Sequence, residues 1–244
     1  MKNLLVKIKN NLKQRGLKKT LTVALSAIKA RSLTEKKKIK LLGKYIDQHN
    51  RAYEKISELA VSLNKGIHPK HGIIKYHQFF LDNIEPNDRV LDAGSGTGLV
   101  AMKIAQKAKY VLGVDFNSKS IEEARNKYKK DNLKFLVADL NEYEPQEKFD
   151  KVVLSNVLEH IRERRELLKN MKKIAPILLL RVPMISRDWL TVYKKLMGFE
   201  YRLDPTHETE YTVEEIEKEL KESGWKIKNY QINWGEWWGV IEHE

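Results

Sequence analysis

The spacing of hydrophobic residues changes along the chain and divides it in two. Apolar residues recur every three to five positions up to about residue 65, which predicts helix throughout this stretch with a charged break near 34–38. A loop is expected at 66–71, where the sequence reads GIHPKH, and helical spacing returns over 73–84. The first part of the chain is therefore expected to contain helices only.

After a predicted turn at 86–88, short β-rich runs alternate with helical runs. This alternation indicates βαβ units and a parallel sheet with helices on both faces. A hairpin at 234–238 would join the last two strands. The pattern predicts strands at 89–93, 110–114, 133–137, 151–155, 177–182, 225–233 and 239–243, and helices at 99–107, 118–130, 162–174 and 212–223.

The two patterns predict two domains: a basic helical extension over 1–65 and an α/β domain over 66–244. Composition narrows the function of both. The chain has no cysteine, which excludes disulfides, thiolate metal sites and cysteine nucleophiles. The sequence shows no apolar run of the length that a membrane span needs and no recognisable signal peptide, which favours a cytoplasmic protein.

The positive charge is concentrated in one segment. The formal net charge is +13, and residues 1–45 hold 14 Lys/Arg against a single acid, Glu35, so they carry the whole excess. A basic amphipathic helix of this kind can lie on an anionic membrane surface. It can equally pack on its own domain or on a second subunit in a homodimer. RNA is less favoured, because no aromatic residue is interleaved with the lysines before Tyr45.

A glycine-rich turn follows the first predicted strand. The string DAGSGTG at 92–98 places Gly94, Gly96 and Gly98 between a strand and a helix, where the backbone can turn tightly and approach a ligand. A nicotinamide dinucleotide fingerprint would need its third glycine at Leu99. A phosphate-binding P-loop would need Gly-Lys-Ser/Thr, which is absent here.

Polar residues stand at the ends of the next strands. Asp115 ends the second strand, where an acid can accept hydrogen bonds from both ribose hydroxyls. Asp139 ends the third strand and could accept from an adenine amine, with Leu140 and Phe116 on either side of the ring. Asn156 follows the fourth strand. Because open α/β sheets bind ligands at this edge, a nucleoside-like ligand is expected.

From about residue 86 to 185 the chain resembles the class I S-adenosylmethionine-dependent methyltransferase superfamily. DAGSGTG is similar to its glycine-rich first motif, Asp115 to its ribose-binding acid, and ADL at 138–140 to its adenine-contacting segment. SNVLEHI at 155–161 resembles the fourth motif of the small-molecule branch, which includes quinone-biosynthesis enzymes and many sugar methyltransferases.

The resemblance implies S-adenosyl-L-methionine as cofactor and a seven-stranded Rossmann-like sheet, mostly parallel, with the last strand antiparallel. His71 and Tyr76 lie where such enzymes often cover the cofactor. The implied cofactor-binding residues are Asp92, Gly94, Ser95, Gly96, Asp115, Phe116, Asp139, Leu140 and Asn156.

Methyl transfer to a hydroxyl benefits from a general base. The candidates are His160, Glu159 and His207, with Asp204 as a helper; the alternative is that Glu159 and His160 merely start a helix and His207 caps a loop. No metal is expected, because relatives with a metal-binding Glu-His pair carry an acid where this chain has Asn156. The fourth motif also lacks the Asn/Asp-Pro-Pro-aromatic sequence of enzymes that methylate base amines.

These observations favour O-methylation of a small-molecule, glycan or lipid-linked acceptor. An RNA methyltransferase and a non-catalytic nucleoside-binding module recruited by its basic arm remain as alternatives. The tryptophans at 225, 234, 237 and 238, with Trp189, are expected either to form a hairpin tip packed into a core or to offer a platform for sugars or membranes.

Overall fold

The computed structural model describes residues 33–243, and the chain divides into two compact units between His68 and Pro69. The first unit contains the long helix α2 (Glu35–Leu63), so the predicted break near 34–38 is wrong at 35–38, which are helical. The part of the predicted extension before residue 33 lies outside the described residues. No helix within 33–243 is both long and apolar enough to cross a membrane.

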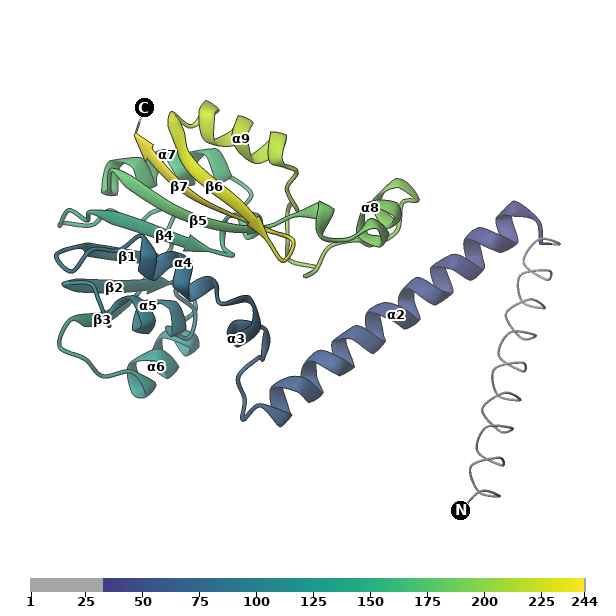
Figure 1. The fold of residues 1–244 in the computed structure, drawn as a ribbon, viewed down its shortest axis with the longest axis horizontal. Coiled ribbons are helices and arrows are strands. Elements are labelled where there is room, and N and C mark those ends of the chain that lie inside the picture. The colour runs from purple at the N-terminus through teal and green to yellow at the C-terminus, as the bar shows by residue number, and fades with distance from the viewer. Residues whose placement is uncertain (1–32, 244) are drawn as a thin grey trace, which may run out of the picture. The chain divides into compact units, whose positions relative to one another are not determined.

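The second unit is built on one seven-stranded sheet with the order β3-β2-β1-β4-β5-β7-β6 (Figure 1). The first five strands pair in parallel, and β7 is antiparallel to both of its neighbours, as expected for the last strand. The strands are β1 (Arg89–Ala93), β2 (Tyr110–Asp115), β3 (Leu133–Val137), β4 (Lys151–Ser155), β5 (Ile177–Pro183), β6 (Trp225–Asn233) and β7 (Glu236–His243).

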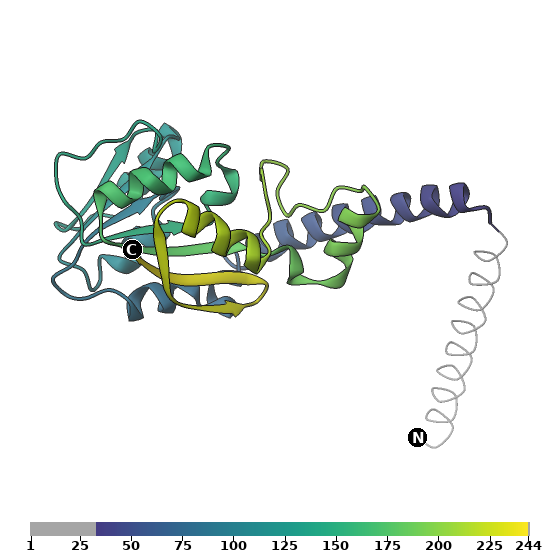
Figure 2. The ribbon, with the colours of Figure 1, turned by 90° about the horizontal axis from the view of Figure 1, so that it is seen from above.

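Helices cover both faces of the sheet, and each face has its own hydrophobic core (Figure 2). The helices are α3 (Lys70–Ile74), α4 (Tyr76–Asp82), α5 (Leu99–Ile104), α6 (Ser118–Lys127), α7 (Arg164–Ile174), α8 (Trp189–Leu196) and α9 (Val213–Glu222), with 3₁₀ turns η1 (Leu158–His160) and η2 (Ile185–Arg187). Alternate residues of one strand enter opposite cores: Leu178 packs with α7 and α9, and Leu179 with α4, α5 and α6.

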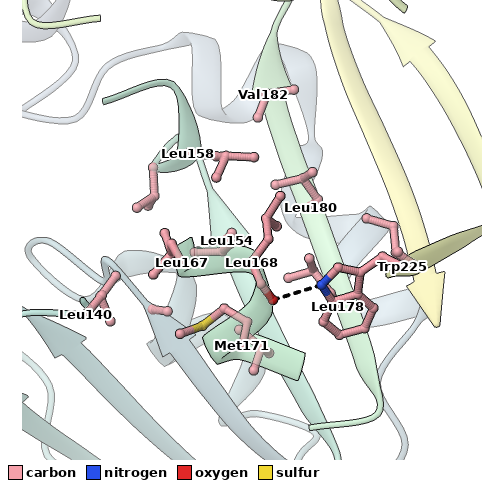
Figure 3. Packing of buried hydrophobic residues seen from close by; sticks show 14 of the residues in the cluster. Leu140, Leu154, Leu158, Leu167, Leu168, Met171, Leu178, Leu180, Val182 and Trp225 are labelled. Carbon is pink, nitrogen blue, oxygen red and sulfur yellow. Dashed lines mark hydrogen bonds between the residues drawn. The ribbon is translucent and has the colours of Figure 1, made fainter. Parts of the chain in front are cut away.

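The core under α7 and α9 is fixed by both packing and a hydrogen bond (Figure 3). Leu167, Leu168 and Met171 of α7 are fully buried against the strands. The indole N–H of Trp225 donates to the carbonyl of Leu168 at 2.9 Å, so this large ring is buried with its polar group satisfied. The core thus packs α7 against strands β4, β5 and β6 of the sheet.

Two predicted boundaries before the sheet are wrong. The single helix expected over 73–84 is two helices, because Lys75 adopts a left-handed conformation (φ 55°) that ends α3 and starts α4. The predicted loop at 66–71 is shorter than expected, since α3 already begins at Lys70. The break turns the chain so that Tyr76 and Phe80 of α4 are buried beside the sheet.

The hairpin between the last two strands is also shorter than predicted. Asn233 pairs with Glu236, so the turn contains only Trp234 and Gly235, both with positive φ. Strand β7 therefore starts three residues before the predicted position. Trp237 and Trp238 lie inside it and are buried, whereas Trp234 at the turn is 68% exposed.

Candidate active site

A cavity of about 270 Å³ opens where the glycine turn leaves β1. Gly94 and Gly96 line it and have φ values of 80° and 51°. A Cβ on Gly94 would lie 2.4 Å from the side chain of Val157, so only glycine fits between the turn and the segment after β4. The residues lining the cavity are Lys70, His71, Tyr76, Asp92, Gly94, Ser95, Gly96, Thr97, Leu99, Val100, Ser155, Asn156 and Arg181.

Asp115 ties the glycine turn to the end of β2. Its Oδ2 accepts a hydrogen bond from the N–H of Gly96, and its Oδ1 accepts one from the N–H of Asn117, both at 2.8 Å. The side chain of Asn117 in turn caps α6. Each carboxylate oxygen retains further acceptor capacity. Asp115 therefore has a fixed orientation at the carboxyl end of its strand, where the sequence predicts a ribose-binding acid.

Three buried polar atoms in the wall of the cavity have no hydrogen-bond partner among the described residues. They are Asp92 Oδ2, Ser95 Oγ and Asn156 Oδ1. Burial raises the pKa of Asp92 to about 7. Asn156 adopts a left-handed conformation (φ 55°), a cost that is usual where structure serves a site. Because unpaired buried polar groups are costly, these atoms indicate a polar ligand rich in hydrogen-bond donors.

The residues predicted to contact adenine are placed differently from one another. Phe116 is 78% exposed at the end of β2. Asp139 is exposed, and its Oδ1 accepts from the backbone and side-chain N–H groups of Asn141. Leu140, in contrast, is buried in the core under α7 and α9. Phe116 and Leu140 were the two residues predicted to lie on either side of the adenine. Of these two, only Phe116 is exposed to a ligand.

Sequence reasoning missed a buried charged pair behind the cavity. The guanidinium of Arg181 donates to both oxygens of Glu236 at 2.6 and 2.5 Å and to Ser155 Oγ at 3.2 Å. It also lies 3.8 Å from the ring centroid of Tyr76. The sequence LLLRVP could have indicated this pair, because the charge of Arg181 in an otherwise apolar strand needs a buried partner.

Tyr76 and His71, which the sequence places over the cofactor, do line the cavity. The hydroxyl of Tyr76 lies 2.9 Å from His71 Nδ1. Burial is the main cause that raises the pKa of Tyr76, to about 12, so the phenol stays neutral. Burial and the charge of Arg181 lower the pKa of Lys70. These three residues line the same cavity as Asp92 and Asn156.

The three predicted catalytic residues come together. One ligand atom of each of Glu159, His160 and His207 lies within 4.8 Å of the other two. The rings of His160 and His207 meet edge to face at 4.6 Å. Glu159 and His160 lie in η1 and His207 in the loop before α9, so two segments far apart in the sequence build the cluster. The backbone N–H of Glu208 donates to the carbonyl of Glu159 at 2.7 Å and joins them.

A short relay fixes the protonation state of His160. Thr206 Oγ1 donates to Asp204 Oδ1 at 2.7 Å, so its only hydrogen is committed. His160 Nδ1 lies 2.9 Å from Thr206 Oγ1, which has no hydrogen left to give, so Nδ1 must donate to it. That tautomer leaves a lone pair on Nε2. Burial and the neighbouring His207 lower the pKa of His160, so the ring is neutral at pH 7 and able to accept a proton.

Glu159 makes the stability of the fold depend on pH. It is fully buried, and burial raises its pKa to about 8, so the folded protein retains a proton that the unfolded chain releases near 4.5. The free energy of unfolding therefore falls as pH rises from about 4.5 to 8, because only the unfolded chain releases the proton in this range. Glu159→Gln does not titrate, so its free energy of unfolding relative to the natural chain should rise between pH 5 and 9, on the order of a few kcal/mol.

Urea unfolding at pH 5, 7 and 9 measures this difference. Glu163→Gln is the matched control, because Glu163 is four residues away and exposed. The difference in free energy of unfolding between Glu163→Gln and the natural chain should not change with pH. A flat difference for Glu159→Gln as well would show that Glu159 is ionised in the folded protein and that the argument from burial is wrong.

Comparison with known proteins agrees with this geometry. Residues 90–175 match the methyltransferase domain family. A ubiquinone biosynthesis O-methyltransferase of Bradyrhizobium diazoefficiens is 30% identical over 118 residues, which is 47% of each chain. Another of that name, from Rhodopseudomonas palustris, is 28% identical over 145 residues, or 56% of this chain and 57% of that one. The chain spans about half the length of the curated relatives it matches.

Solved structures share the fold. Magnesium protoporphyrin IX methyltransferase from Synechocystis, solved with bound S-adenosylhomocysteine, aligns with a TM-score of 0.55 and 20% identity over 87% of this chain and 89% of that one. An S-adenosylmethionine-dependent methyltransferase from Clostridium acetobutylicum gives 0.56 and 15% over 79% and 99%.

The family match over residues 90–175, with the sheet order and the glycine turn, identifies a methyltransferase domain in the second unit that is similar to the class I S-adenosylmethionine-dependent enzymes. Its sequence relatives among the ubiquinone O-methyltransferases agree with the resemblance of the fourth motif to the small-molecule branch.

Proposed function

We propose that the chain is an enzyme that transfers a methyl group from S-adenosylmethionine to a hydroxyl group of a small-molecule acceptor. The observation that carries the proposal is the convergence of Asp92 Oδ2, Ser95 Oγ and Asn156 Oδ1, all buried and unpaired among the described residues, on the cavity beside the glycine turn. Buried polar atoms without a partner are rare in folded proteins, which supports a ligand at this place.

The residues fit the two ends of this cofactor. The oxygens of Asp92 and Asn156 suit positively charged groups. S-adenosylmethionine has two of them at its methionine end, the ammonium and the sulfonium. The carboxylate of Asp115 suits a diol. Phe116 offers a flat apolar surface beside it for a base. When bound, the cofactor would supply an electrophilic methyl group, and the protein has only to orient it and exclude water.

His160 is the proton acceptor in this proposal. Its Nε2 carries the lone pair, and the Asp204–Thr206 relay holds the ring in that tautomer. A proton taken from an acceptor hydroxyl would leave His160 positively charged beside Glu159 and Asp204. Glu159 is available to stabilise that charge by giving up its own proton to solvent, which its raised pKa of about 8 makes possible near neutral pH.

The acceptor class rests on the relatives and on the charge of the chain. The relatives named ubiquinone biosynthesis O-methyltransferases act, by name, on an oxygen atom in making a quinone. A phenolic, sugar or lipid-linked hydroxyl is therefore proposed in preference to nucleic acid. The basic segment 1–45 is proposed to hold the protein on an anionic membrane surface, and its retention on anionic vesicles should fall as salt is raised.

Calorimetric titration with S-adenosylhomocysteine tests the cofactor, with NAD as the control ligand. Saturable binding of the first and none of the second is expected, because the glycine spacing does not suit a dinucleotide. The binding should release protons or take them up as pH crosses 7, since Asp92 titrates there. Equal binding of both ligands, or of neither, would contradict the proposal.

A further inference from the structure

Helix α8 exposes its apolar face and buries its polar one. Its buried residues are Thr191 and Lys194. Trp189, Val192, Tyr193 and Leu196 stand at positions i, i+3, i+4 and i+7, which is one face of a helix, and they are 76%, 37%, 36% and 78% exposed. This reverses the usual arrangement of a helix at a protein surface.

Hydrogen bonds and charges hold α8 in this orientation. Asp188 caps the helix and accepts from both the backbone N–H of Thr191 at 2.7 Å and its hydroxyl at 3.0 Å. Burial lowers the pKa of Lys194, and the carboxylates of Asp188, Glu200 and Glu210 oppose this effect by attracting its charge. Rolling the helix to bury Trp189 and Leu196 would break these interactions, so the outward face is a stable feature.

The apolar face extends beyond the helix. Met197 and Leu203 are 36% and 50% exposed, and Trp234 is 68% exposed on the turn that packs against Arg187 just before α8. Figures 1 and 2 both show α8 projecting beyond the carboxyl end of β5. It therefore stands at the edge of the sheet where the candidate active site opens.

We propose that the α8 face (Trp189, Val192, Tyr193, Leu196 and Met197) inserts into the interfacial layer of an anionic lipid bilayer. Tryptophan and tyrosine favour that layer because one side of the ring is apolar and the other polar. The exposed Lys195 beside Leu196 complements anionic headgroups, and so does the positive excess that residues 1–45 of the same chain carry.

A second copy of the chain fits this face less well. A stable protein interface takes about 20–30 residues a side, and α8 offers five apolar side chains on barely two turns. A bilayer needs no matching surface, and insertion of a short helix parallel to the membrane is enough. The inference does not rest on the proposed methyl transfer, because the orientation and exposure of α8 carry it alone.

Tryptophan fluorescence of the full chain tests the insertion at α8 itself. All five tryptophans lie within the described residues, and only Trp189 and Trp234 are exposed. In Trp234→Phe, vesicles of phosphatidylglycerol should shift the emission to shorter wavelength, and lipids brominated in the acyl chains should quench it. Both effects should disappear in the double variant Trp234→Phe/Trp189→Phe.

A pair of charge substitutions gives the energetic test. Leu196→Glu should weaken binding to the same vesicles about ten- to hundredfold, since burying a leucine is worth about 1.5–3 kcal/mol. Leu136→Glu, an exposed leucine on β3, should leave binding unchanged. Vesicle binding without any response of Trp189 would assign the binding to the basic segment and overturn the proposal. An emission shift that grows with protein concentration alone would assign the face to a second copy. An unchanged affinity of Leu196→Glu for the vesicles would also overturn it.

Discussion

Asp115→Ala is expected to weaken binding of S-adenosylhomocysteine by about a hundredfold. The substitution removes two effects at once. It deletes the acceptors proposed for the ribose hydroxyls, and hydrogen bonds to a charged group contribute about 1.5–3 kcal/mol each. It also frees the N–H groups of Gly96 and Asn117, which Asp115 holds at 2.8 Å. Calorimetric titration measures the loss.

Two further variants separate these effects from a general disturbance. Asp131→Ala removes an exposed acid from the segment that precedes β3 and should leave the affinity unchanged. Asp115→Asn keeps one oxygen but turns an amide donor toward one of the two backbone N–H groups, so an intermediate loss is expected. Affinity of Asp115→Ala within about threefold of the natural chain, with the fold intact, would remove Asp115 from the binding site.

The sheet and the cofactor end of the site could be predicted from the sequence because they depend on local signals. Each parallel strand is a short apolar run, and each glycine or aspartate at a strand end follows directly from it. Asp115 is an example: its position after VLGV already placed it beside the glycine turn. Parallel strands bring their carboxyl ends to one edge whatever the loops do.

What could not be predicted depends on residues far apart in the sequence. The pairing of Arg181 with Glu236 joins two strands that become neighbours only in the folded sheet. The break at Lys75 has no helix-breaking residue to announce it, because lysine adopts a left-handed conformation only when tertiary packing of Tyr76 and Phe80 outweighs the cost. The Trp234–Gly235 turn lacks the usual Asn-Gly or Asp-Gly sequence.

The catalytic cluster lies between these two cases. Glu159 and His160 were identifiable from the motif after β4, and His207 from its polar loop. The sequence could not show that Thr206 connects Asp204 to His160, because His160 lies 46 residues before it. This relay changes the interpretation of the cluster, because it assigns Nδ1 of His160 as a donor and leaves Nε2 to accept a proton.

His160→Ala is therefore expected to lower kcat by a factor of about 10²–10⁴, the usual contribution of a general base. Affinity for S-adenosylhomocysteine should stay within about twofold, because His160 does not line the cofactor cavity. Release of S-adenosylhomocysteine with catechol as hydroxyl acceptor measures turnover. Since burial and His207 lower its pKa below the ordinary 6.5, His160 becomes protonated only in acid, so the natural chain should keep full activity at pH 7 and lose it only at a pH below 6.5.

Thr206→Val tests the relay apart from the base itself. Valine keeps the shape of threonine but cannot accept a hydrogen bond from Nδ1, so His160 should lose its fixed tautomer. We expect kcat to fall about tenfold and the acid limb of the pH profile to be displaced. His243→Gln, which changes a histidine bonded to the carbonyl of Ala175 at the far end of β7, is the control and should leave kcat unchanged. If Thr206→Val and His160→Ala both retain full kcat, proton removal belongs to another group in the cluster, and His207 would be the next candidate because it is buried in contact with His160.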